Sequence, residues 1–301
     1  MKYIIRFTLL LLFAGLITSS HAQIIDNRLG KVFQEEMYFN QQFVWQNKIK
    51  SITGIKSIKR PNRPIEARPD LIAFRFNEVG QLTSMDKISS VLHIVDSLSI
   101  TYKRNNLGDL EFVTETGNKG YFTTQYHYDN QGRIDRMNYN KTENLSQEKG
   151  KLEPGQTILV NNETYEWQET EQGVLKKKNF NNYGLHYSNW TMVKNELGYI
   201  QSETEELIMS GRTTTKTYTY NEKGWVSETT ISDNQNNKTK TEKYTYDELG
   251  NLKKVQYYND KELVREIEIL YKSNLLLEAF LDHDMITDEV IITKFSFEYY
   301  K

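Results

Sequence analysis

The sequence predicts an all-β protein in which tandem antiparallel β-hairpins form one large curved meander sheet, preceded by a short N-terminal helix. Two observations predict this fold class. A turn motif, Asx-x-x-Gly in six units and Thr-x-x-Gly in one, marks seven units along the chain, and the segments between the motifs alternate apolar and polar residues, as strands with one buried face do. The 301 residues contain no cysteine, so packing rather than disulfide bonds has to stabilise the fold.

Residues 1–22 have the composition of a secretory signal peptide. Lys2 and Arg6 provide a positive start, Leu9 to Ile17 form a short apolar core, and Ser20-His21-Ala22 predicts cleavage before Gln23. No second apolar run of this kind follows, so we expect no transmembrane segment after cleavage. Because no cysteine is available to carry a lipid, we expect a periplasmic or secreted bacterial protein that is not a lipoprotein.

Residues 23–70 are predicted to hold the N-terminal helix and an extended connector. Between residues 26 and 47 apolar side chains recur at roughly helical spacing, and Asp26 or Asn27 is placed to cap the helix. These apolar residues are Leu29, Val32, Phe33, Met37, Val44 and Trp45. Residues 59–69 contain three of the four prolines of the chain, which predicts an extended connector.

The repeats occupy residues 71–301, and each unit is predicted to be a β-hairpin. Asn or Asp at the first position of the motif accepts hydrogen bonds from the turn backbone, and the glycine three residues later takes the left-handed conformation that closes the hairpin. The seven glycines are Gly80, Gly108, Gly132, Gly173, Gly198, Gly224 and Gly250. The residues three positions before them are Asn77, Asn105, Asp129, Thr170, Asn195, Asn221 and Asp247.

The slot three residues after each glycine never holds an apolar side chain, which predicts a sheet with one water-facing side. Its residues are Thr83, Glu111, Asp135, Lys176, Gln201, Ser227 and Lys253. Gly132 and Gly173 lie 41 residues apart, further than any other neighbouring pair, so we expect an insertion at about residues 140–162. An eighth hairpin without a turn glycine is expected at Tyr271 to Asn274.

Two of the turn segments resemble the YD repeat of the Rhs family. They are Tyr128-Asp129-Asn130-Gln131-Gly132-Arg133-Ile134 and Tyr246-Asp247-Glu248-Leu249-Gly250-Asn251-Leu252, and residues 76–82 and 220–226 are looser copies. The resemblance spans about residues 71–260. It implies a β-sheet that curls as in the shells of that family, some of which enclose toxins, and it implies carbohydrate binding at a cell surface. The chain has too few repeats to enclose a toxin, so hairpin stacking is the feature that the resemblance implies here.

No motif in the sequence argues for catalysis, so we expect no enzyme, no cofactor and no metal. Walker, GxGxxG, GxSxG and HExxH motifs are absent. Asp282-His283-Asp284 is the best metal candidate, but alternation along a strand would turn His283 away from the two carboxylates. The formal charge of −2 provides no field that would recruit nucleic acid. An enzyme with its site in the 140–162 insertion and the concave sheet face is kept as an alternative.

The predicted function is a non-enzymatic binding or scaffold protein of the bacterial cell envelope, with a glycan or an envelope protein as its ligand. Three consecutive units carry Val174, Tyr199 and Trp225 directly after the turn glycine. Stacked in register, they would form a patch that suits a sugar ring or a partner protein, unless the insertion covers it. An outer-membrane β-barrel is a further alternative, although the segment from Lys238 to Lys243 would place charges on a lipid-facing wall. The oligomeric state stays open.

Overall fold

A computed structural model describes residues 23–34, 39–91, 94–117, 120–146, 148, 153–170 and 173–301. The predicted signal peptide, residues 1–22, lies outside the described residues. The described chain contains the short helix α2 (Gln41–Gln46) followed by eighteen β-strands. The strands are β1 (Ile49–Lys59), β2 (Ile65–Phe76), β3 (Leu82–Val91), β4 (Ile94–Arg104), β5 (Leu110–Gly117), β6 (Gly120–Tyr128), β7 (Ile134–Asn144), β8 (Pro154–Glu169), β9 (Leu175–Phe180), β10 (His186–Lys194), β11 (Ile200–Leu207), β12 (Arg212–Tyr220), β13 (Val226–Asp233), β14 (Asn236–Tyr246), β15 (Leu252–Asn259), β16 (Glu262–Tyr271), β17 (Leu277–Asp284) and β18 (Glu289–Tyr299).

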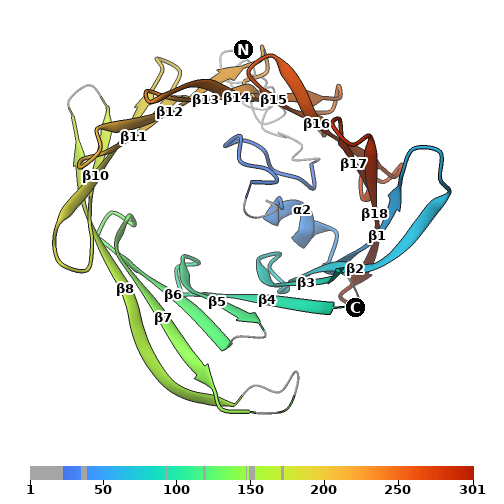
Figure 1. Ribbon diagram of the computed structural model, residues 1–301, viewed down its shortest axis with the longest axis horizontal. Coiled ribbons are helices and arrows are strands. Elements are labelled where there is room, and N and C mark those ends of the chain that lie inside the picture. The colour runs from blue at the N-terminus through green and yellow to red at the C-terminus, as the bar shows by residue number, and fades with distance from the viewer. Residues whose placement is uncertain are drawn as a thin grey trace, which may run out of the picture.

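The strands form a closed antiparallel β-barrel (Figure 1). Each strand pairs with the next along the chain, and the last strand returns to the first, with Ile52 opposite Phe297 and Gly54 opposite Phe295. The prediction of an open curved meander sheet was therefore wrong. It assigned residues 59–69 to a connector, whereas β1 and β2 form a hairpin there, and β1 supplies the edge on which β18 closes. Closure gives every described strand a partner on both sides, although residues 154–163 of β8 pair with β7 alone.

Closure of the sheet changes which of the functions predicted from the sequence is best supported. A closed eighteen-stranded barrel supports the outer-membrane β-barrel alternative better than it supports an open binding scaffold. The closed barrel also conflicts with the curled, shell-type sheet that the resemblance to the YD repeat implies, so that fold was wrongly predicted. The described residues contain no helix long and apolar enough to cross a membrane.

The Asx-x-x-Gly turns have the geometry that the sequence predicts. All seven motif glycines have positive φ. In the turn between β14 and β15, Asp247 Oδ1 accepts hydrogen bonds from the backbone N–H of Leu249 at 2.9 Å and of Asn251 at 2.8 Å. All seven turns follow an even-numbered strand, so they lie at the same end of the barrel. We call this end the turn rim.

A tyrosine latch links neighbouring hairpins at the turn rim. In four units the tyrosine directly before the turn donates its hydroxyl hydrogen to the backbone carbonyl of the first residue of the preceding strand. These bonds run from Tyr128 to Leu110 at 2.7 Å, from Tyr220 to Ile200 at 2.7 Å, from Tyr246 to Val226 at 2.8 Å and from Tyr271 to Leu252 at 2.8 Å. Each latch satisfies a polar group on a half-buried ring, so the tyrosine stabilises the packing between hairpins.

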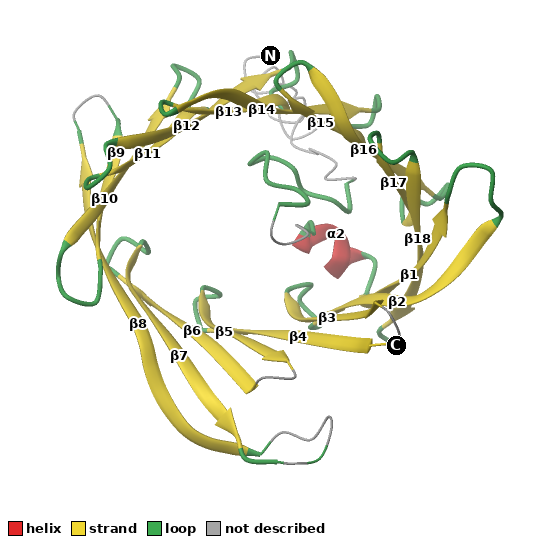
Figure 2. Cartoon of the chain, viewed as in Figure 1, coloured by secondary structure: helices red, strands yellow, loops and turns green. Residues whose placement is uncertain are grey.

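The N-terminal segment, by which we mean the described residues 23–34 and 39–47, lies inside the barrel (Figures 1 and 2). The predicted helix over residues 26–47 is reduced to the six residues of α2, whose N-cap is Asn40 rather than Asp26 or Asn27. Gly30 and Phe33 both have positive φ, which interrupts a right-handed helix. The segment buries apolar side chains against inward-facing residues of the wall. The fully buried ones in this segment are Ile24, Ile25, Val32 and Val44.

The described residues of the 140–162 region belong to a long hairpin rather than to a covering insertion. The strands β7 and β8 extend it at the end opposite the turn rim, where Leu145 N–H bonds to Glu153 O at 2.8 Å. The hairpin projects away from the ring in Figure 1. It therefore does not cover the residues that follow the turn glycines.

The two faces of the wall differ in chemistry. Tyr218, Tyr244, Val255 and other inward side chains form the core with the N-terminal segment. Over β4 to β16 the outward side chains are mainly hydroxyl-bearing or charged. Cross-strand hydroxyl pairs there are Thr114–Thr123, Thr204–Thr215 and Thr230–Thr241, and Lys254 forms ion pairs with Glu266 and Glu268.

The strands around the closure carry a different outer surface, which we call the seam stripe. It consists of Leu281, Ile292, Ile55, Leu71 and Ile88 on β17, β18, β1, β2 and β3. Leu281 pairs with Ile292, Ile55 with Leu71, and Leu71 with Ile88. Ile55 is 58% exposed. The stripe is interrupted at the closure, where Ile55 lies opposite Lys294, so it is a discontinuous apolar strip on part of the circumference of the wall.

Candidate ligand-binding rim

The turn rim holds a pocket of about 590 Å³ between the wall and the N-terminal segment, which we call the rim pocket. The wall contributes residues from the β10–β11, β12–β13 and β14–β15 turns. The N-terminal segment contributes the opposite side. The lining residues are Gln23, Asp26, Asn27, Arg28, Leu29, Asn40, Gly198, Tyr199, Ile200, Tyr220, Lys223, Gly224, Trp225, Tyr246, Glu248 and Leu249.

Two aromatic pairs form the wall side of the rim pocket. Tyr199 stacks on Tyr220 with ring centroids 4.8 Å apart and planes at 25°. Trp225 packs on Tyr246 at 5.2 Å and 46°. In each pair the residue that follows one turn glycine contacts the latch tyrosine that precedes the turn of the next unit. Tyr199 remains 39% exposed, so its ring is accessible to a ligand.

The turn glycines make room for these rings. A Cβ on Gly250 would lie 2.6 Å from the Trp225 ring and 2.5 Å from Gln23 Nε2. A Cβ on Gly224 would likewise collide with the hydroxyl of Tyr199. The glycine of one unit thus serves both as the left-handed turn residue and as the contact surface for the aromatic side chain of the preceding unit.

Polar groups complete the rim pocket from both sides. Asn27 Nδ2 donates to the hydroxyl of Tyr246 at 3.0 Å, which ties the N-terminal segment to the wall. Arg28 forms an ion pair with Asp26, and Lys223 Nζ donates to Glu248 O at 2.9 Å while lying over the Trp225 ring at 4.9 Å. Burial raises the pKa of Tyr246 to about 12, so its hydroxyl is a neutral hydrogen-bonding group at physiological pH.

The structure places the three site residues that the sequence predicts as follows. Tyr199 and Trp225 both line the rim pocket, whereas Val174 does not. Val174 is half-buried in the β8–β9 turn, where its N–H bonds to Thr170 Oγ1 at 3.2 Å. The rings of Tyr199 and Trp225 pack on inward-facing tyrosines, so they turn towards the mouth of the barrel rather than onto the wet outer face.

Sequence reasoning missed the N-terminal side of the rim pocket. Asp26 and Asn27 were interpreted as helix caps, whereas Asn27 is buried and binds both the wall and the N–H of Val32, at 3.3 Å. The Gly30 turn that follows was the available signal against a helix starting here. Nothing local in the sequence indicates that Asn27 would meet a residue 219 positions away.

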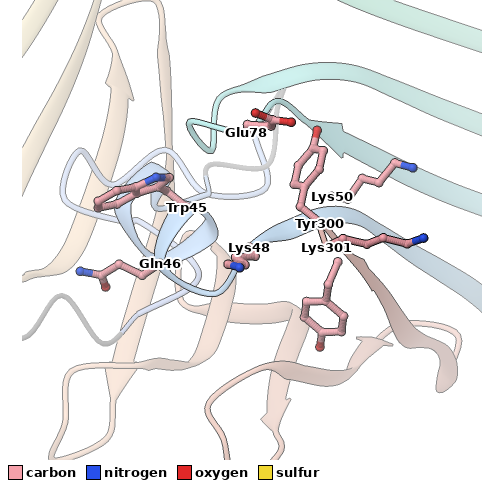
Figure 3. A pocket seen from close by; sticks show the side chains of 8 residues that line it. Trp45, Gln46, Lys48, Lys50, Glu78, Tyr300 and Lys301 are labelled. Atoms are coloured by element: carbon pink, nitrogen blue, oxygen red, sulfur yellow. The ribbon is translucent and has the colours of Figure 1, made fainter.

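A second pocket at the turn rim surrounds α2 and the C-terminus (Figure 3). It has a volume of about 850 Å³. Figure 3 shows Trp45 and Gln46 of α2 on one side and Tyr300 and Lys50 on the other. Trp45 is 54% exposed, so the pocket is a broad surface depression rather than an enclosed site. Its lysines are Lys48, Lys50 and Lys301.

The metal candidate of the sequence does not form a ligand cluster. Asp282 faces inward and forms a bidentate ion pair with Arg265, at 2.7 Å for both contacts. His283 faces the other way, and its Nε2 lies 2.7 Å from Asp288 Oδ1. Within the described residues no group of three or more His, Asp or Glu side chains is arranged to hold a metal ion.

Comparisons with known proteins give remote likenesses only. No family model matches the chain, and no curated protein matches it. A porin-like protein from Bacteroides uniformis is similar at 11% identity and a TM-score of 0.41, covering 84% of this chain and 97% of the other. A porin-like protein from Bacteroides vulgatus is similar at 7% identity and a TM-score of 0.34, covering 84% and 98%. TcdB2-TccC3 without its hypervariable C-terminal region is similar at 13% identity and a TM-score of 0.21, covering 74% and 17%. At these TM-scores the likenesses carry no argument about function.

Proposed function

We propose that the protein is a β-barrel of the bacterial cell envelope that binds a glycan in the rim pocket. The observation that carries this proposal is the pairing of two aromatic stacks with polar side chains around a space of about 590 Å³. That volume lies within the roughly 300–1,000 Å³ range of small-molecule pockets.

The chemistry of the rim pocket suits a sugar. A sugar ring offers an apolar face, which stacks on an aromatic ring, and hydroxyl groups at its edge, which need hydrogen-bonding partners. The half-exposed Tyr199 supplies such a ring. Arg28 and Lys223 supply donors, and Asp26 supplies an acceptor, all within the lining of the same pocket.

Closure of the barrel favours the outer-membrane alternative, whereas the chemistry of the outer wall favours a position in the aqueous part of the envelope, either periplasmic or secreted. A lipid-facing barrel presents an apolar band about 25 Å tall, and a charge at the bilayer midplane costs about 2–4 kcal/mol. Over β4 to β16 the outward residues include Lys254, Glu266 and many threonines. These side chains are solvated at no such cost in water.

A specific observation favours membrane contact as a second candidate. The seam stripe places Ile55, Leu71 and Ile88 side by side on the outer wall. An apolar strip on five strands would rest against the outer membrane while the rest of the wall faces water. This candidate predicts peripheral association of the barrel with lipid vesicles.

Binding of the purified mature barrel to an array of bacterial envelope glycans tests the proposed function. Tyr199→Ala and Trp225→Ala should each weaken binding by about tenfold or more, because aromatic anchors dominate binding energies. Tyr183→Ala is the matched control, since Tyr183 is 80% exposed in a turn at the opposite end of the barrel. Equal binding by all four proteins would contradict the proposal.

Flotation with vesicles of outer-membrane lipid separates the two placements. A barrel that stays with the aqueous fraction supports the position in water, and one that floats but is released by carbonate supports contact through the seam stripe. Integration that resists carbonate and protects β4 to β16 from protease would contradict both placements and support the outer-membrane β-barrel that the closed fold favours.

A further inference from the structure

A separate cavity of about 280 Å³ lies inside the barrel, beside the apolar core. It is bounded by the N-terminal segment at Phe33 and Gln34 and by inward-facing residues of β1, β2, β3, β16, β17 and β18. None of its lining residues belongs to the rim pocket. We call it the inner cavity.

One side of the inner cavity is apolar. Phe74, Met85 and Ile267 are buried there, at 1%, 2% and 3% exposure. Phe280 closes this side by edge-to-face contacts with Phe33 at 5.3 Å and with Phe295 at 4.6 Å. An apolar group placed against these side chains would be removed from water on several sides.

The other side of the inner cavity is positively charged. Lys56, Lys87 and Arg265 line it, and Asp282 is the one carboxylate in the lining. Because Arg265 and Asp282 form a bidentate ion pair with each other, that carboxylate is already neutralised. Within the described part of the chain neither Lys56 nor Lys87 forms a hydrogen bond or an ion pair, so two ammonium groups face the cavity without a counter-ion.

We propose that the inner cavity binds a small carboxylic acid with an apolar body, with its carboxylate between Lys56 and Lys87. A carboxylate would pair with the ammonium groups, and the apolar body would cover Met85 and Ile267. A neutral apolar compound would leave both lysines unpaired, and an inorganic anion would leave the apolar side wet. The volume is just below the usual range of small-molecule pockets, which favours a short acid.

Titration of the mature barrel with octanoate tests the proposal, with octanol and octylamine as ligands of the same length but different charge. Calorimetry gives the affinity, and the methyl signal of Met85, assigned with Met85→Leu, reports whether the ligand enters the inner cavity. Octanoate should bind at least about tenfold more tightly than octanol, because a hydrogen bond to a charged group contributes about 1.5–3 kcal/mol. Octylamine should not bind.

Lys56→Met and Lys87→Met should each weaken octanoate binding by about tenfold and leave octanol binding unchanged. Lys294→Met is the matched control, because Lys294 points outward on β18, directly after the cavity residue Thr293, and it should bind octanoate like the unaltered protein. Equal affinities for octanoate and octanol in the unaltered protein would overturn the proposal without relying on any variant. Binding that leaves the Met85 signal unmoved, or that Lys294→Met weakens equally, would also overturn it.

Discussion

Replacing Gly250 with alanine separates two roles that the structure gives to the turn glycines. Gly250 has a φ of +94° and packs against the Trp225 ring. Gly132 has a φ of +74°, and an added Cβ there would meet nothing within 4 Å. Gly132→Ala therefore measures the backbone strain of the turn alone, and Gly250→Ala measures strain plus the loss of space.

The two contributions have different expected magnitudes. A non-glycine residue in a left-handed conformation costs about 1–2 kcal/mol. An added Cβ at 2.6 Å from the Trp225 ring has to displace that ring from Tyr246, and overpacking of this kind costs about 1–3 kcal/mol more. We expect a loss of about 1–2 kcal/mol for Gly132→Ala and of about 2–5 kcal/mol for Gly250→Ala.

Urea unfolding followed by tryptophan fluorescence and by circular dichroism measures both losses. Gly250→Ala should also change the fluorescence of the folded state, because the displaced ring belongs to Trp225, whereas Gly132→Ala should not. If the two variants lose equal stability, the packing of Trp225 on Gly250 is unimportant. If Gly132→Ala loses none, the left-handed turn is not the conformation that the motif requires.

Three further predictions concern the latch tyrosines and α2. Tyr246→Phe removes the bonds to Val226 O and Asn27 Nδ2 and should cost about 1–3 kcal/mol in urea unfolding, whereas Tyr258→Phe on the outer wall should cost well under that. Burial raises the pKa of Tyr246 to about 12, so the unfolded chain releases this proton near pH 10 while the folded chain retains it. The free energy of unfolding should therefore fall by up to about 3 kcal/mol as pH rises from about 10 to about 12. Urea unfolding across that pH range should show a less steep fall in Tyr246→Phe. Asn40→Ala removes the N-cap bond to Phe43 N–H and should cost about 1 kcal/mol, and Asn40→Ser should restore most of that loss.

The hairpins were predictable because their determinants are local. Asp247, its two backbone partners and Gly250 all lie within five residues, so one short motif contains the whole turn. The alternation of inward and outward residues has a period of two, which any strand must follow. The same local reasoning failed for residues 26–47, where Val32 and Val44 are buried against the surrounding wall while Leu29 and Trp45 stay exposed, and Met37 lies outside the described residues.

The candidate site was predictable only in part. The rings of Tyr199 and Trp225 interrupt a polar series in the sequence, which indicated a special role at the turn ends. Their partners Tyr220 and Tyr246 are the same residues that mark the turn motif, but the stacking itself depends on the register between neighbouring hairpins. Val174 follows the same sequence pattern and lies outside the rim pocket, because its turn is not beside the N-terminal segment.

The sequence by itself determined the strands, the turns and which residues share a face, since each of these depends on contacts within one hairpin. Only the tertiary structure decided that the sheet closes, that the N-terminal segment lies inside the barrel, and that three pockets form beside it. Those features depend on pairs such as Ile52 with Phe297 and Asn27 with Tyr246, which are far apart in sequence. Such contacts form because an apolar face of this size has to be buried, and closing the wall around the described N-terminal residues, 23–34 and 39–47, buries it.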